Sequence, residues 1–376
     1  MFTAVWTASP QRPSEGFTPN WSEEGFWRQS LRQVVRLSAG GGRVRVRLSN
    51  AYGTSPVRVA GASVGRTADG AGVAPGSLTR LTFGGAGQVG IPAHGEAVSD
   101  DVRLDAVAGE SVTVTLYFDA ATGPATFHAQ AFTSAYRGEG DLTADAGGEG
   151  FDAVTESWYF LTGVEVDAGR ADAVALFGDS ITDGFGSTVG ADRRWPDALA
   201  GRTGRPVLNA GIGGNLLLND SAWYGEKGVH RLRRDVLDRP GVDTLVVALG
   251  VNDIGFSETD EQPTYKPAPV VEAEELIAGH RELIRRGRAA GLRVIGCTLL
   301  PFGGSDHWGE RAAKVGHELN EWIRCSGEYD AVADLGRALA DPADPDRLRP
   351  PYDFGDHLHP NDAGYEVMAE VVAAIL

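Results

Sequence analysis

The chain has 376 residues, 42% of them hydrophobic, which is enough for two domains with substantial cores. Its formal net charge of −17 at pH 7 disfavours a nucleic acid or an anionic membrane surface as a partner, because both carry negative charge. Two cysteines, Cys297 and Cys325, are too few for a disulfide framework or a multi-cysteine metal site.

The N-terminal stretch MFTAVWTASPQRP contains neither the basic nor the apolar region of a secretory signal peptide. No apolar run in the chain reaches the roughly 20 residues needed to span a membrane. We therefore expect a cytoplasmic protein, or a secreted one whose leader has been removed, with no membrane partner. The sequence carries no indication of the oligomeric state.

Residues 1–168 are rich in short β-type runs separated by Gly, Asp and Pro clusters. In RVRVRL, Arg alternates strictly with Val or Leu, which is typical of a strand with one solvent-facing side. Several short strands with frequent turns and no long helix predict an antiparallel β-sandwich, which we interpret as an accessory domain. The expected strands are 43–50, 56–64, 110–118 and 155–166.

Residues 169–376 instead alternate apolar runs with helical stretches. The stretch VEAEELIAGHRELIRRGRAAG, for example, has an apolar stripe of Leu and Ile and a glycine suited to end a helix. Five buried strands separated by helices predict a parallel sheet covered by helices on both faces. The expected strands are 173–177, 206–210, 243–249, 292–300 and 329–335.

Three residues suited to acyl chemistry follow three of these strands, at the edge where parallel α/β sheets bind ligands. Ser180 lies in FGDSITDGFG, Gly214 in NAGIGGNLLL and Asn252 in ALGVNDIG. The serine is a candidate nucleophile, the glycine allows a backbone N–H to face a ligand, and the asparagine offers an amide donor. Their positions predict a shared site at this edge.

The loop DFGDHLHPNDAGY before the last helix contains the base and the carboxylate that a nucleophilic serine requires. Asp356 and His359 are three residues apart, a spacing that lets the carboxylate reach Nδ1 of the imidazole while Nε2 faces outward. Two histidines and an aspartate without a further ligand make a poor zinc site. We therefore predict no bound metal, and a structural or rim role for His357.

In this order, the four segments resemble the four sequence blocks of the SGNH (GDSL-type) hydrolases. The resemblance covers roughly residues 171–376 and implies a flavodoxin-like five-stranded sheet and an esterase mechanism without metal or organic cofactor. It also implies that Asp356 completes a Ser–His–Asp triad, and that the N–H groups of Ser180 and Gly214 form an oxyanion hole with the Asn252 side chain. The four matching positions are Ser180, Gly214, Asn252 and His359.

The β-rich first part resembles the N-terminal domain of an SGNH subgroup described as similar to xylan-cluster acylesterases. The G-x-S-x-G motif of the α/β-hydrolases is absent, because Thr182 stands where its second glycine would be. We therefore expect hydrolysis of short acyl esters, in particular acetyl esters, of a carbohydrate or related polyhydroxylated molecule. The alternatives are an acyltransferase or arylesterase/lipase with the same site, and a glycan-binding protein with a degenerate hydrolase scaffold.

The walls of the substrate crevice are expected to come from the loops after neighbouring strands. Aromatic faces suit the C–H surface of a sugar ring, and Asn or His side chains suit its hydroxyl groups. For the two tryptophans, packing within their own loops is the alternative. The candidate substrate-binding residues are Asn215, Trp223, Tyr224, Phe256, Phe302, His307 and Trp308.

Overall fold

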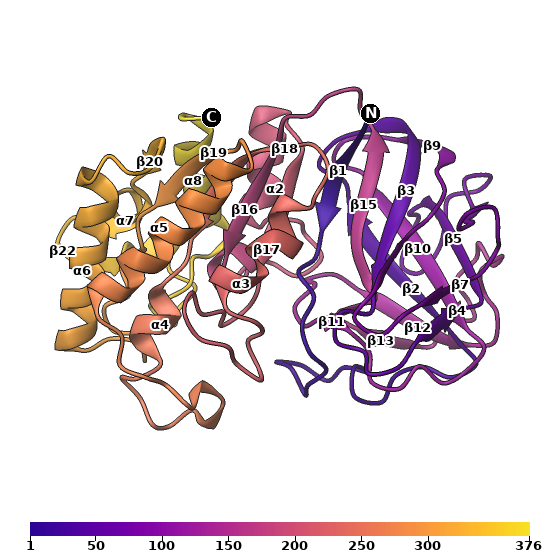
Figure 1. Ribbon diagram of the computed structural model, residues 1–376, viewed down its shortest axis with the longest axis horizontal. Coiled ribbons are helices and arrows are strands. Elements are labelled where there is room, and N and C mark those ends of the chain that lie inside the picture. The colour runs from indigo at the N-terminus through magenta and orange to yellow at the C-terminus, as the bar shows by residue number, and fades with distance from the viewer. The chain divides into compact units, whose positions relative to one another are not determined.

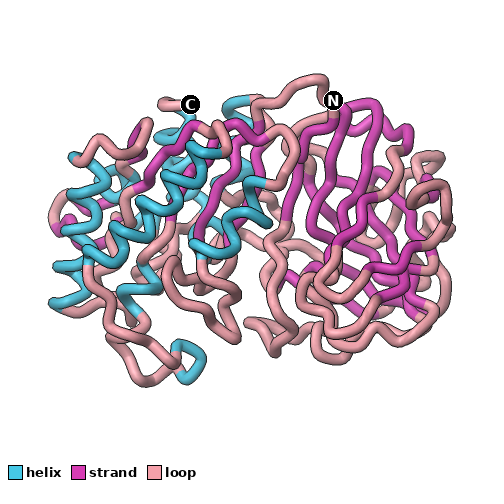
Figure 2. Tube along the Cα trace, in the orientation of Figure 1, coloured by secondary structure: helices cyan, strands magenta, loops and turns pink.

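The computed structural model describes residues 1–376, and the chain divides into two compact units, Met1–Ala171 and Asp172–Leu376 (Figure 1). This division lies close to the boundary between residues 168 and 169 that the sequence suggests. The first unit consists of strands and loops, whereas the second combines strands with helices (Figure 2). None of the helices has both the length and the apolar character required to cross a membrane.

Two antiparallel sheets make up most of the first unit. The strands are β1 (Phe2–Thr7), β2 (Gln29–Arg36), β3 (Gly41–Ser49), β4 (Val57–Val59), β5 (Gly61–Arg66), β6 (Thr79–Arg80), β7 (Val89–Ile91), β8 (Glu96–Val98), β9 (Val102–Ala106), β10 (Ser111–Phe118), β11 (Phe127–His128), β12 (Ala135–Glu139), β13 (Ala153–Thr155), β14 (Trp158–Tyr159) and β15 (Leu161–Asp167). One sheet has the order β1-β15-β3-β8, with β9 also paired to β3, and the other has the order β13-β12-β2-β10-β5-β6. The remaining strands form the pairs β11-β14 and β4-β7.

Both sheets contribute to one hydrophobic core, as the alternating sequence pattern leads us to expect. Strand β3 shows how the pattern works, because Val44, Val46 and Leu48 are fully buried on one of its faces. On the other face, Arg45 and Arg47 are not simply solvent-facing. They pair with Glu165 of β15, a carboxylate that is itself buried.

The segment 56–64, expected to be one strand, is two strands in different sheets. Strand β4 pairs with β7, and β5 pairs with β10 and β6. Ala60 separates them, and its N–H donates to the carbonyl of Tyr117 in β10. The apolar run alone does not reveal this break, because both halves bury valines.

The second unit contains the predicted five-stranded parallel sheet. Its strands are β16 (Ala173–Gly178), β17 (Val207–Gly211), β18 (Val242–Ala248), β19 (Arg293–Cys297) and β20 (Ala331–Ala333), in the order β17-β16-β18-β19-β20. All four neighbouring pairs are parallel. The five strands expected from the sequence are all present, although β19 and β20 are shorter than expected.

The helices cover both faces of this sheet. They are α1 (Ser180–Asp183), α2 (Trp195–Thr203), α3 (Gly228–Leu232), α4 (Val251–Gly255), α5 (Ala273–Ala289), α6 (Glu310–Cys325), α7 (Leu335–Leu339) and α8 (Asp362–Ala373). The chain moves from β16 to β17 in one direction and from there to β18, β19 and β20 in the other. Right-handed crossovers therefore place α2 on one face and α3, α5 and α6 on the other. Helix α8 packs against α2.

The remaining short elements of the second unit lie in its connections. They are the π-helical turn Arg233–Leu237, which continues α3, the 3₁₀ turns Pro263–Tyr265 and Pro350–Tyr352, and the strand pair β21 (Ala340–Asp341) and β22 (Asp344–Leu348). Because the strands of the main sheet are parallel, the loops that follow β16, β17, β18 and β19 all leave the same edge. The candidate functional residues of the sequence are carried by these loops and by the loop before α8.

Candidate active site

Ser180 is the first residue of α1, directly after the buried strand β16. The carboxylate of Asp179 caps this short helix by accepting the N–H of Ile181 at 3.0 Å. Burial raises the pKa of Asp179 to about 7. The helix ends at Asp183, and Gly184 follows it with a φ of 119°, a conformation that favours glycine. A Cβ at Gly184 would lie 2.3 Å from Cγ of Arg194. The tight turn thus keeps Ser180 at the carboxyl edge of the sheet.

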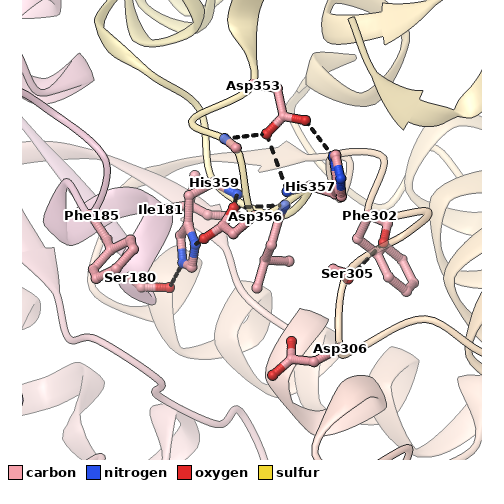
Figure 3. Close-up of polar contacts among 12 residues, drawn as sticks. Ser180, Ile181, Phe185, Phe302, Ser305, Asp306, Asp353, Asp356, His357 and His359 are labelled. Carbon is pink, nitrogen blue, oxygen red and sulfur yellow. Dashed lines mark hydrogen bonds and ion pairs between the residues drawn. The ribbon is translucent and has the colours of Figure 1, made fainter. Parts of the chain in front are cut away.

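The last loop brings His359 and Asp356 to Ser180 (Figure 3). Oγ of Ser180 is 2.8 Å from Nε2 of His359, and Nδ1 of His359 is 2.6 Å from Oδ2 of Asp356. The carboxylate accepts a hydrogen bond, so the proton of a neutral imidazole lies on Nδ1. Nε2 is then free to accept the proton of the serine hydroxyl.

The environment of Asp356 keeps its carboxyl group ionised. Burial alone would raise its pKa, but the hydrogen bond and charge of the His359 ring, together with two backbone N–H donors, outweigh burial. These donors are the N–H groups of Leu358 and His359, at 3.0 and 2.9 Å from Oδ1. The net effect lowers the pKa of Asp356 to about 2.

His357, between these two residues, turns away from Ser180 and pairs with Asp353 (Figure 3). Its Nδ1 is 2.6 Å from Oδ2 of Asp353, and its φ is +64°. No cluster of three or more His, Cys, Asp or Glu side chains in the chain has the arrangement of a metal site. The pairing with Asp353 therefore gives His357 a structural role within the loop.

Gly214 and Asn252 stand at the ends of the two neighbouring strands. Gly214 has a φ of +70°, and a Cβ on it would lie 2.3 Å from the ring of Tyr224, so no larger residue fits. Asn252 lies in the first turn of α4 and is 2% exposed. Its Nδ2 donates one hydrogen to the carbonyl of Asn215 at 3.0 Å. This is the one hydrogen bond that the Asn252 amide donates within the protein.

Arg231, which the sequence analysis does not identify, connects the loops after β16 and β17 from the interior of the protein. Its fully buried guanidinium donates to the carbonyl of Gly178 at 2.7 Å, the carbonyl of Ala210 at 2.8 Å and the side chain of Asn215 at 2.9 Å. Asp235, one turn further along, accepts from it at 3.1 Å and balances its charge. One side chain thereby holds the ends of β16 and β17 and the loop that carries Gly214.

Asp253 provides a second tie between loops. Its carboxylate accepts hydrogen bonds from the N–H groups of Leu217 and Leu218, at 2.7 and 3.0 Å. Both leucines belong to the loop after β17. Burial raises its pKa to about 7. Asp253 therefore ties the start of α4 to the loop that follows β17.

Two of the seven predicted rim residues have no polar atom left for a sugar. Asn215 is fully buried, and its side chain bonds the carbonyls of Tyr224 and Glu226 and the guanidinium of Arg231. His307 is 1% exposed, and both of its ring nitrogens have protein partners. Both assignments are corrected, because these side chains lie beneath the site and organise it.

The predicted aromatic residues of the rim divide into buried and half-buried ones. Tyr224, Phe256 and Phe302 are at most 7% exposed and pack within the protein. Trp223 is half-buried against the cluster formed by Tyr224 and Phe256. Trp308 is half-buried edge-on to Phe302, and both line a cavity of about 520 Å³ beside α6. Of the seven predicted rim residues, only the two tryptophans are more than slightly exposed.

The chain was compared with known protein families and with individual proteins. A model of the GDSL-like lipase/acylhydrolase family matches residues 176–367, slightly more than half of the chain. An acetylxylan esterase of Xylanibacter ruminicola is 26% identical over 238 residues, which cover 56% of this chain and 45% of that protein. The chain therefore spans less than half of the length of this relative.

Solved structures show similarity over somewhat more than half of the chain. A carbohydrate acetylesterase from Sinorhizobium meliloti is 16% identical with a TM-score of 0.41, over 54% of this chain and 97% of that one. The aryl esterase of M. smegmatis is 15% identical with a TM-score of 0.42, over 55% of this chain and 98% of that one.

The lowered pKa of Asp356 predicts how the stability of the protein depends on acid. A carboxyl group whose pKa falls from 3.8 to about 2 on folding stabilises the protein above pH 3.8. This contribution disappears as the pH falls through about 2. Urea unfolding of wild type and Asp356→Asn should therefore show a stability difference at pH 5 that shrinks towards pH 2. A difference that stays constant over this range would contradict the assignment.

Replacing Arg231 tests the tie between the loops. In Arg231→Lys a single ammonium replaces the planar fork, so several of its buried acceptors lose their donor. We expect the free energy of unfolding to fall by about 2–4 kcal/mol. Arg285→Lys, which alters an exposed pair with Glu282, is the matched control and should change it by less than about 0.5 kcal/mol. Equal effects of the two substitutions would show that Arg231 does not stabilise the connection between these loops.

Proposed function

Because the chain belongs to the GDSL-like lipase/acylhydrolase family, we propose that it is a serine esterase, with Ser180 as nucleophile. The observation that supports this most is the unbroken hydrogen-bond chain from Ser180 through His359 to Asp356. Its three members come from two distant segments of the sequence, at the carboxyl edge of the five-stranded parallel sheet. We assign residues 169–376 as the catalytic domain and residues 1–168 as an accessory domain.

The proposed mechanism follows from where the protons lie in the hydrogen bonds between Ser180, His359 and Asp356. Ser180 Oγ attacks the ester carbonyl while Nε2 of His359 takes its proton, and the same nitrogen then returns the proton to the leaving alcohol. Asp356 holds the ring in the tautomer with the proton on Nδ1 and stabilises the imidazolium that forms. Water, activated by His359, releases the acid from the acyl-enzyme. No metal or organic cofactor takes part.

The oxyanion of the tetrahedral intermediate is assigned to three donors. They are the backbone N–H groups of Ser180 and Gly214 and the second amide hydrogen of Asn252. The N–H of Ser180 has no acceptor within α1, because Ser180 is the first residue of that helix. The N–H of Gly214 makes no backbone hydrogen bond in its loop. Such preorganised donors act where negative charge develops, and each is typically worth a factor of about 10²–10³ in kcat.

We propose that the acyl group is short, in particular acetyl, and that the alcohol is a carbohydrate or a related polyhydroxylated molecule. The similarity to an acetylxylan esterase supports this substrate class. The half-buried indoles of Trp223 and Trp308 support it as well, because an aromatic face suits the C–H surface of a sugar ring. Phe185, whose ring centroid is 4.4 Å from that of His359, adds an apolar wall next to the catalytic base.

Covalent labelling with a fluorophosphonate tests the nucleophile. Wild type should be labelled at Ser180 and should hydrolyse p-nitrophenyl acetate, whereas Ser180→Ala should not be labelled and should lose roughly 10⁴-fold or more in kcat. Ser187→Ala, in the loop after α1, is the control that keeps both properties. An unlabelled wild type without activity would favour a binding protein on a hydrolase scaffold.

Kinetics on paired substrates test the proposed alcohol and acyl group. We expect kcat/KM to fall from p-nitrophenyl acetate to the butyrate and octanoate esters. Trp308→Ala should raise KM for acetylated xylo-oligosaccharides several-fold more than KM for p-nitrophenyl acetate. Trp322→Ala removes another half-buried indole, near the opposite end of α6, and should change neither. Equal effects of Trp308→Ala on both substrates would remove it from the sugar site.

A further inference from the structure

Another Asp–His pair lies behind the side-chain amide of Asn252. Nδ1 of His307 is 2.7 Å from Oδ1 of Asp306, and Nε2 of His307 is 3.0 Å from Oδ1 of Asn252. On its other side, Nδ2 of Asn252 donates to the carbonyl of Asn215 at 3.0 Å. A series of hydrogen bonds therefore connects the carboxylate of Asp306, through the imidazole of His307, to the amide of Asn252 that is assigned to the oxyanion hole.

The orientation of the Asn252 amide determines where the protons of His307 must be. The carbonyl of Asn215 can only accept, so it faces Nδ2 of Asn252, and the amide oxygen then faces His307. An amide oxygen also only accepts, so Nε2 of His307 carries a proton. Nδ1 carries one too, because its partner is the carboxylate of Asp306. Satisfying both hydrogen bonds requires an imidazolium.

The surroundings of His307 hold the ring in this place. The side chain is 1% exposed and lies edge-on to the rings of Phe256 and Tyr265, each with centroids 5.6 Å from its own. Gly255 leaves the room for it, since a Cβ there would lie 2.1 Å from the imidazole. A side chain as enclosed as this has little rotational freedom and little competition from water.

Asp306 is the counter-charge of this buried ring. Its carboxyl also accepts the hydroxyl of Tyr265 at 3.2 Å. The hydrogen bond from His307 lowers the pKa of Asp306, and burial of the carboxyl only partly opposes this. The carboxylate is thus ionised at neutral pH, and the pair presents its positive end to Asn252.

We propose that Asp306 and His307 are positioning residues that fix and polarise the Asn252 amide as an oxyanion donor. This inference rests on the proposed esterase function. A positive charge next to the amide oxygen draws electron density towards it and makes the N–H on the opposite end a stronger donor. The hydrogen bond also prevents the amide from rotating and presenting its oxygen to the oxyanion.

The predicted effect falls on the transition state and not on substrate binding. A ground-state ester carbonyl carries little charge, so a more polarised donor gains mainly when the oxyanion forms. Loss of the Asp306–His307 pair should therefore lower kcat and leave KM nearly unchanged. A residue that only supported the shape of the crevice would alter KM as well.

A double-mutant cycle tests whether His307 acts through Asn252. Alone, His307→Leu should lower kcat about tenfold and Asp306→Asn by less, while His307→Gln, which keeps one donor for Asn252 but not the positive charge, should give a kcat between those of wild type and His307→Leu. In the Asn252→Ala background, His307→Leu should change kcat by less than about twofold, because the group it acts on is gone. The control His317→Gln alters another Asp–His pair, with Asp346 on the surface, and should leave kcat unchanged.

A tenfold loss from His307→Leu that persists in the Asn252→Ala background would overturn the proposal. If His307→Leu does not fold, Asp306→Asn and His307→Gln carry the same cycle. Nitrogen-15 NMR of histidine-labelled protein provides an independent readout, since wild type should show one imidazolium with both nitrogens protonated that His307→Gln lacks. A neutral His307 ring would also overturn it. If wild type neither hydrolyses esters nor labels at Ser180, the proposed function fails, and the NMR signal still decides the protonation of His307.

Discussion

The candidate site depends on the hydrogen bonds that the buried guanidinium of Arg231 donates to three neighbouring segments. Parallel strands end with carbonyl groups that have no partner in the next strand, and the loops that follow are otherwise free to diverge. Arg231 holds these strand ends and the loop together, because its planar guanidinium reaches the carbonyls of Gly178 and Ala210 and the side chain of Asn215 at the same time. Asp235 neutralises it, so a full charge remains stable in the interior.

Hydrogen bonds connect Arg231 to Asn252 through Asn215. Asn215, held by Arg231, accepts the amide of Asn252 through its backbone carbonyl. Asp253, next to Asn252, accepts two N–H groups of the same loop. The proposed oxyanion donors Gly214 and Asn252 are thus positioned by buried polar groups. Such a network accounts for the buried charged residues at this edge of the sheet.

Two of the Asp–His pairs at this edge use the same residue types for opposite purposes. His359 pairs with Asp356 and faces a serine hydroxyl, so its Nε2 accepts a proton. His307 pairs with Asp306 and faces an amide oxygen, so its Nε2 donates one. The partner on the far side of each ring therefore decides its protonation state, and the sequence context of the two histidines gives no hint of this difference.

The sequence by itself determined the five parallel strands, the β-rich first part and the segments that carry Ser180, Gly214, Asn252, Asp356 and His359. These features depend on local hydrophobic periodicity and on short motifs at strand ends, which remain visible in one dimension. Only the tertiary structure decided that Asn215 and His307 lie beneath the site, that Arg231 and Asp253 tie its loops together, and that 56–64 divides between two sheets. An asparagine or histidine on a predicted loop reads the same whether it faces a ligand or a buried carbonyl, because its role depends on partners that are distant in sequence and meet only when the chain has folded.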